Sequence, residues 1–156
     1  MDDIITKIID LLKVQLTTTY KKYYYGENVI PEQALFPFIE VIPNSTSISN
    51  RGTGGTKDNQ FSVTIRIKDT IKNFINANTN QEKHSAMQAM VKRMEERTNN
   101  TFKNTSVLYV LANNLQLGGQ ANINDNWEIS YDVLPLNGSY IIIASVTFNV
   151  NLLSYI

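Results

Sequence analysis

Cysteine is absent from this chain of 156 residues, and histidine occurs once. Without cysteine the chain can form no disulfide, no thiolate nucleophile and no zinc site built on sulfur. The single histidine, His84, cannot supply a pair of imidazole ligands for a metal, and we interpret it as a solvent-exposed residue of a helix. With so few reactive groups we expect a protein that is not an enzyme and that needs neither cofactor nor metal.

Charged residues are also scarce. They make up 18% of the chain, and 14 Lys and Arg balance 14 Asp and Glu, so the net charge gives little attraction for nucleic acid or an anionic membrane. No segment reaches the ~18 consecutive apolar residues of a membrane-spanning helix. The acidic start, Met1-Asp2-Asp3, is unlike a signal peptide. We expect a protein that is assembled in a cytosol and binds no membrane.

Two segments have the spacing of an amphipathic helix. The first runs from Asp3 to Lys22, and its β-branched threonines make the end after Leu16 prone to fray. The second begins at the capping-box pattern Thr79-Asn80-Gln81-Glu82 and ends near Arg97. We expect its buried stripe to consist of Met87, Met90, Val91 and Met94.

Alternation of apolar and polar residues predicts a hairpin. Leu35–Pro43 and Phe61–Lys68 both alternate, and Pro37 lacks an amide proton, so the first strand should begin there or run along a sheet edge. The polar segment between them, Asn44 to Gln60, is far longer than the about two to five residues of ordinary hairpin loops. We expect a long functional or disordered loop.

Two further strands are expected before the end of the chain. Ser106–Ala112 is apolar throughout, which favours a central strand. Trp127–Val133 alternates, so Trp127 and Tyr131 should lie on its dry side and Glu128, Ser130 and Asp132 on its wet side.

The last segment, Ser139–Ser154, alternates over its full length. As one strand it would span roughly 50 Å at ~3.3 Å per residue, against a usual strand of about five or six residues. Two interpretations are open. Either a bend near Ala144–Thr147 divides it between two parts of a sheet, or its far end leaves the core and pairs with a neighbouring copy.

Together these segments predict one α+β domain spanning residues 1–156. It should contain an amino-terminal helix, a β-hairpin with a long loop, and a second helix packed on a mixed or antiparallel sheet that a long strand closes. The glycines of the expected loop do not form a phosphate-binding Walker pattern, because Thr56 separates Gly55 from Lys57 and a strand follows in place of a helix.

The amino-terminal helix, the strand Phe36–Pro43, a polar loop, the strand Phe61–Ile67, a second helix and closing strands follow one another along nearly the whole chain. This pattern resembles the tail terminator, or tail-completion, proteins of long-tailed bacteriophages. The resemblance implies a structural virion protein of the neck, assembled in the host cytoplasm. Six copies would form a ring that terminates the tail tube and joins it to the head connector, while phage DNA passes through without sequence-specific binding.

The resemblance also implies where contacts lie. The loop Asn44–Gln60 would face the tube, the channel or the connector, and the end of the last strand would augment a neighbour's sheet. Charge and expected exposure alone nominate Arg51, Lys57 and Lys68. The candidate interface residues are Arg51, Gly52, Gly54, Gly55, Lys57, Lys68, Phe148, Val150, Leu152 and Leu153.

Two alternatives are open. Another neck adaptor or tail component with a related fold would show the same pattern. From a different class, a monomeric small-ligand-binding domain could enclose a pocket lined by Trp127, Tyr131, Tyr109 and the methionines.

Overall fold

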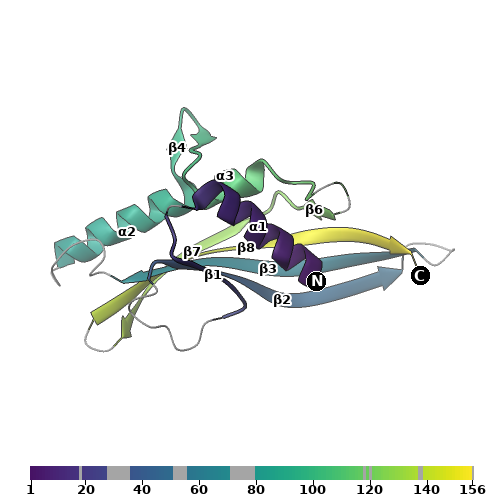
Figure 1. Ribbon diagram of the computed structural model, residues 1–156, viewed down its shortest axis with the longest axis horizontal. Helices are drawn as coiled ribbons and strands as arrows, with labels where there is room; N and C mark the ends of the chain where they lie inside the picture. Colours follow the sequence, from purple (N-terminus) through teal and green to yellow (C-terminus); the bar gives the residue numbers. More distant parts are fainter. Residues whose placement is uncertain are drawn as a thin grey trace.

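The computed structural model describes residues 1–17, 19–27, 36–50, 56–70, 80–117, 119, 121–136 and 139–155. Within these residues the chain forms an α+β fold whose helices lie on one face of a curled sheet (Figure 1). In chain order the elements are α1 (Asp2–Leu16), β1 (Lys22–Tyr25), β2 (Phe38–Asn50), β3 (Thr56–Thr70), α2 (Asn80–Glu95), β4 (Arg97–Thr98), β5 (Thr101–Phe102), α3 (Val107–Ala112), β6 (Ala121–Ile123), β7 (Glu128–Leu136) and β8 (Ser139–Tyr155).

One mixed sheet holds the strands that the structure describes, apart from the short β4–β5 hairpin. Its neighbours follow the order β1-β2-β3-β8, and the other edge of β8 pairs with β7 and then with β6. β1 runs parallel to β2, whereas the remaining pairs are antiparallel. The β2–β3 hairpin expected from the alternation is confirmed.

The closing strand is one continuous element. β8 is 17 residues long and pairs with β3 from Ile141 to Tyr155 without a break in register. From Val150 to Leu152 its opposite edge pairs with β6. Because both edges are occupied there, the expectation that this end leaves the core and augments a neighbour's sheet is wrong for these residues.

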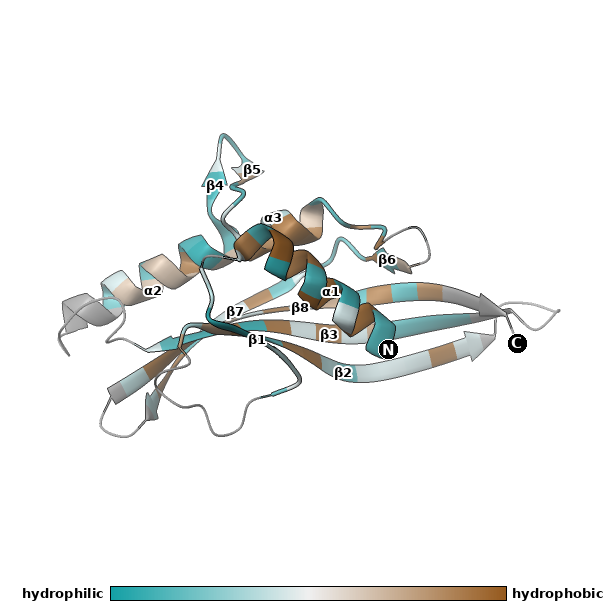
Figure 2. Ribbon diagram, viewed as in Figure 1, coloured by the Kyte–Doolittle hydropathy of each residue, from teal (hydrophilic) through white to brown (hydrophobic). Residues whose placement is uncertain are grey.

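The main core lies between the sheet and the helices. α1 ends at Leu16, where fraying was expected to begin, so the expected helix to Lys22 is too long, and Lys22 begins β1 instead. Its buried side consists of Ile4, Ile5, Ile8, Ile9, Leu12 and Leu16. In α2, Met90 and Met94 are fully buried, and Met87 packs against the core while half-buried. Thr79, the first residue of the expected capping box, lies outside the described residues. In Figure 2 hydrophobic and hydrophilic residues alternate along α1, and α3 is mainly hydrophobic.

A smaller apolar cluster lies on the opposite face of the sheet. Phe36, Phe38 and Ile141 are buried there, with Tyr24 and Ile143 packed against them. Phe38 faces away from the helices because successive side chains of a strand alternate, and its neighbour Ile39 belongs to the main core. This face is therefore apolar only near the start of β2.

The segment expected to be a central strand, Ser106–Ala112, is a helix. Ser106 is the N-cap of α3, and its hydroxyl accepts a hydrogen bond from the Tyr109 amide at 3.3 Å. A short apolar run fits a buried strand or a buried helix equally well, and here the cap decides the outcome. Four of the six residues in α3 are buried: Val107, Leu108, Val110 and Leu111.

The expected long loop, Asn44 to Gln60, is also mostly strand. β2 continues to Asn50 and β3 begins at Thr56, with pairs from Ser45–Ser62 to Asn50–Lys57. The register shifts between Pro43 and Ser45, which marks a bulge. Polar residues form strands here because β8 pairs along the other edge of β3 as far as Thr56. Only 51–55 separate the two strands, and they lie outside the described residues.

Candidate functional site: the uncovered face and open edges of the sheet

One face of the sheet points away from the helices. Val63, Ile65 and Ile67 are buried beneath the helices. The alternating residues Ser62, Thr64 and Arg66 therefore point to the other side. No helix in the described part of the chain covers this side (Figure 1). We call it the uncovered face.

Over the far half of β2, β3 and β8 the uncovered face consists almost entirely of uncharged polar side chains. Register aligns them in rows: Thr64 with Thr147; Ser45 with Ser62 and Asn149; Ser47 with Gln60 and Asn151. In Figure 2 the far halves of β2 and β3 are mostly teal or pale, whereas β8 alternates teal and brown because its other face packs in the core.

Hydrogen bonds tie these rows together. The Asn44 side chain, placed at the bulge, donates to Thr64 Oγ1 at 2.7 Å, and the Thr64 and Thr147 hydroxyls are 2.8 Å apart. Asn151 donates to Asn124 Oδ1 at 2.6 Å. The polar surface is thus partly fixed by its own contacts, although most of β2 from Asn44 onward remains exposed.

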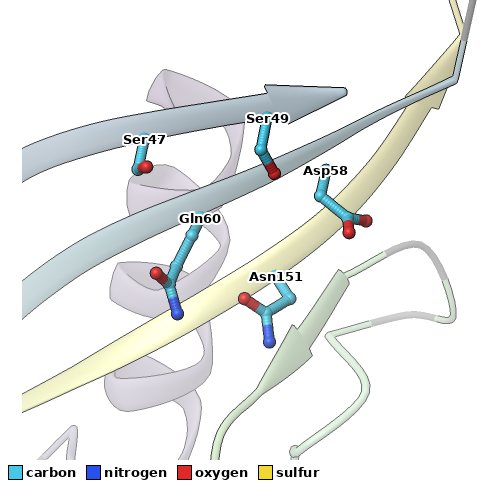
Figure 3. A pocket seen from close by; sticks show the side chains of 5 residues that line it. All are labelled: Ser47, Ser49, Asp58, Gln60 and Asn151. Atoms are coloured by element: carbon cyan, nitrogen blue, oxygen red, sulfur yellow. The ribbon is translucent and has the colours of Figure 1, made fainter. Parts of the chain in front are cut away.

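A hollow of about 370 Å³ lies near the far end of this face. Figure 3 shows its five side chains on the near side of β2, β3 and β8, with α1 behind the sheet. They are Ser47, Ser49, Asp58, Gln60 and Asn151. This set offers hydroxyl and amide groups and one carboxylate, which can exchange hydrogen bonds with a polar partner but provide neither a nucleophile–base pair nor a cation.

Charged residues gather at the other end of the uncovered face. Lys68 Nζ lies 3.0 Å from Glu40 Oε1, and Glu40 is fully buried. Glu27 lies 3.6 Å from Arg66 and 3.9 Å from Lys68. Glu27, Arg66 and Lys68 line a second hollow of about 320 Å³, which Asp132 also lines. The cations here are engaged by carboxylates of the same chain.

This arrangement corrects one candidate contact. Lys68 was nominated as an exposed charge, but it is buried because it compensates the carboxylate of Glu40, which would be costly to bury alone. The sequence analysis did not identify Glu40 as a functional or buried residue. The only indication in the sequence is that Glu40 is a single acidic residue within an apolar strand.

The hydrophobic candidates are not free surface either. Phe148 and Val150 point toward the helices and are buried in the main core, so the prediction that they contact a neighbour is wrong. Leu152 is half-buried and packs against the same core. The structure places the backbones of Lys57 and Leu153 opposite Ser154 and Asp58, and it does not describe their side chains. Arg51, Gly52, Gly54 and Gly55 lie outside the described residues.

Two long strand edges have no strand partner among the described residues. β1 pairs with β2 only from Phe38 to Val41, and beyond Val41 no strand among the described residues pairs with the outer edge of β2. β7 pairs with β8 on one side, and the described strands leave its other side unpaired. Both edges carry exposed apolar side chains: Ile48 is 60% exposed, Leu134 49% and Val133 37%.

The residues proposed for a ligand pocket are mostly packing residues. Tyr131 donates to Glu95 of α2 at 2.5 Å, and burial together with this hydrogen bond raises the pKa of Tyr131. The Trp127 indole donates to the Asn124 carbonyl at 2.6 Å. Both rings are half-buried against the core, where Met90 and Met94 fill the space between α2 and the sheet.

Buried polar groups on the helix side join α2 to the sheet. Arg93 Nη1 lies 2.7 Å from Asp69 Oδ2, and Asp69 is fully buried. Burial raises the pKa of the nearby Tyr20, whose hydroxyl has no hydrogen-bond partner within the described structure. Because Asp69 and Arg93 compensate each other, we interpret them as a structural tie.

The described ranges contain no group of three or more His, Cys, Asp or Glu side chains placed to hold a metal. None of the helices described is both long and apolar enough to cross a membrane. The sequence matches no protein-family model and no curated protein.

Proposed function

We propose that this chain is a structural protein that assembles with copies of itself into a closed ring. The observation that carries the proposal is the pair of unlike open edges, β2 and β7, on opposite sides of one sheet. A contact between two different patches joins copies head to tail, and such a series closes into a ring when the rotation between neighbours allows it.

The setting we propose is the neck of a long-tailed bacteriophage, as the resemblance to tail terminators implies. The ring, of six copies, would terminate the tail tube and bind the tube protein and the head connector, without catalysis. The composition of the uncovered face supports a channel-lining role. Among the described side chains its far half carries one charge, the carboxylate of Asp58, and the Arg66 and Lys68 cations are paired with carboxylates, so DNA could pass without being held.

Native mass spectrometry with negative-stain imaging over a range of concentrations tests this proposal. We expect a species near 106 kDa, about six times the 17.7 kDa chain, with an open centre. Because a ring can need a template, the same measurement is repeated with purified tail tubes. A chain that stays monomeric in both settings would contradict the proposal.

A further inference from the structure

We infer that the joint between neighbouring copies is an antiparallel pairing of β7 from one copy with the open section of β2, from Ile42 to Asn50, in the next. The inference rests on the proposed ring and names its interface. Pairing of this kind satisfies backbone groups that an open edge leaves to solvent.

Elimination favours these two strands. β3 is enclosed by β2 and β8. β8 pairs with β3 on one side and, over Ser139–Thr147 and Val150–Leu152, with β7 and β6 on the other. β6 is only three residues long. The long unpaired edges in the described part of the sheet are therefore those of β2 and β7.

Strand direction and length both fit when the next copy is displaced along the strands. β7 lies level with Ser139–Thr147 of β8, whereas the open section of β2 lies, through β3, level with Thr147–Ser154. β2 and β8 run one way, and β3 and β7 run the other, because each pair along this path is antiparallel. In a ring, copies keep the same orientation, so β7 of the next copy meets β2 antiparallel and extends the alternation. β7 has nine residues, and nine of the thirteen in β2 remain after the four that pair with β1.

The side chains on the uncovered face are complementary. β7 carries Glu128 and Asp132 there, whereas the open section of β2 carries the uncharged row Ser45, Ser47 and Ser49. Serine hydroxyls can donate to the carboxylates. Two β7 strands placed against each other would instead oppose like charges, which destabilises a strand pair.

The helix side is complementary as well. Ile48 of β2 and Val133 of β7 are exposed apolar residues on that side of their strands. In a sheet that continues from copy to copy, both belong to the same face, so pairing buries apolar surface that each copy alone leaves in water.

Disulfide trapping tests the joint, because the chain has no cysteine of its own. Ser47→Cys and Ser130→Cys place thiols on the two edges, both on the uncovered face. Mixed and mildly oxidised, the two variants should give at least about tenfold more covalent dimer than either alone, since a bound neighbour raises the effective thiol concentration. Ser49→Cys, mixed with Ser130→Cys in the same way, tests the pairing in which β7 is displaced by two residues along β2.

The double variant Ser47→Cys/Ser130→Cys should give a ladder of covalent oligomers on a non-reducing gel. Val14→Cys, 82% exposed on α1, is the matched control and should not trap with Ser130→Cys. Efficient self-trapping of Ser47→Cys would show a twofold β2–β2 contact and overturn the inference. The inference would also be overturned if rings form but neither Ser47→Cys nor Ser49→Cys gives a covalent dimer with Ser130→Cys. That result would leave the ring proposal intact. Absence of any oligomer by native mass would contradict the ring itself.

Discussion

At the scale of single residues, the fold is marked by charges that it buries and compensates. Glu40 lies between apolar residues of β2, and Lys68 covers it from β3, two strands that the hairpin brings together. A buried carboxylate that loses its cation costs far more than an exposed ion pair contributes.

Lys68→Met should therefore lower the free energy of unfolding by about 3 kcal/mol. The matched control, Lys7→Met on the exposed side of α1, should change it by less than about 0.5 kcal/mol. Urea denaturation measures both. The double variant Glu40→Gln/Lys68→Met should recover part of the loss, and equal effects of Lys68→Met and Lys7→Met would contradict the buried pair.

Tyrosines give the molecule a stability limit at alkaline pH. Burial raises the pKa of Tyr23 to about 12, above the usual 10, and its hydroxyl donates to the Leu16 carbonyl at 2.9 Å. Between pH 10 and 12 the unfolded chain loses this proton while the folded chain keeps it, so stability falls as pH rises. Tyr23→Phe should flatten the decline in melting temperature over that range; an unchanged slope would contradict this.

At the scale of elements, the sequence predicted those whose two faces differ. α1, α2, β7 and β8 were recognised because apolar and polar residues alternate in them at a helical or strand period. The far end of β2 was missed because Ser45 to Ser49 is polar on both faces but for Ile48, so only pairing with β3 makes it a strand. α3 was missed because Val107–Ala112 is apolar all round, which gives no period to read.

The candidate site was less predictable than the fold. Loop glycines and charges drew attention to 51–57, whereas the uncovered face is assembled from β2, β3, β7 and β8, and its rows depend on a register that the sequence does not display. Phe148 and Val150 were misassigned because alternation shows only that one face of a strand is apolar. It does not show whether that face packs against helices of the same chain or against a neighbouring copy.

The cap of α3 allows a test at this scale. Ser106→Ala removes the hydroxyl that accepts from the Tyr109 amide and donates to the Lys103 carbonyl at 2.8 Å. Loss of an N-cap typically costs about 1 kcal/mol, so chemical denaturation should show a drop of that size. Ser49→Ala, at an exposed strand position, is the control. If the two variants were equally stable, the cap would contribute nothing.

At the scale of the whole molecule, helices cover one face of the described sheet, and two of its long edges have no strand partner among the described residues. A lysine placed on an open edge is a common protection against strand pairing. Ile48→Lys should therefore keep the chain monomeric by native mass while its melting temperature stays within about 3 °C of the parent, because Ile48 is already exposed. Val14→Lys on α1 should assemble normally, and rings formed by Ile48→Lys would argue against the β2 edge as the joint.

The short strand β1 would then limit where a strand from a neighbouring copy can pair with β2. It occupies the outer edge of β2 from Phe38 to Val41, and the Gly26 amide closes that stretch by donating to the Val41 carbonyl at 2.8 Å. A strand from another copy that pairs with the outer edge of β2 would meet β1 at Ile42. β1 would therefore prevent that strand from shifting further toward the start of β2. In the proposed ring, the offset between neighbouring copies would then be set by the four residues of β1.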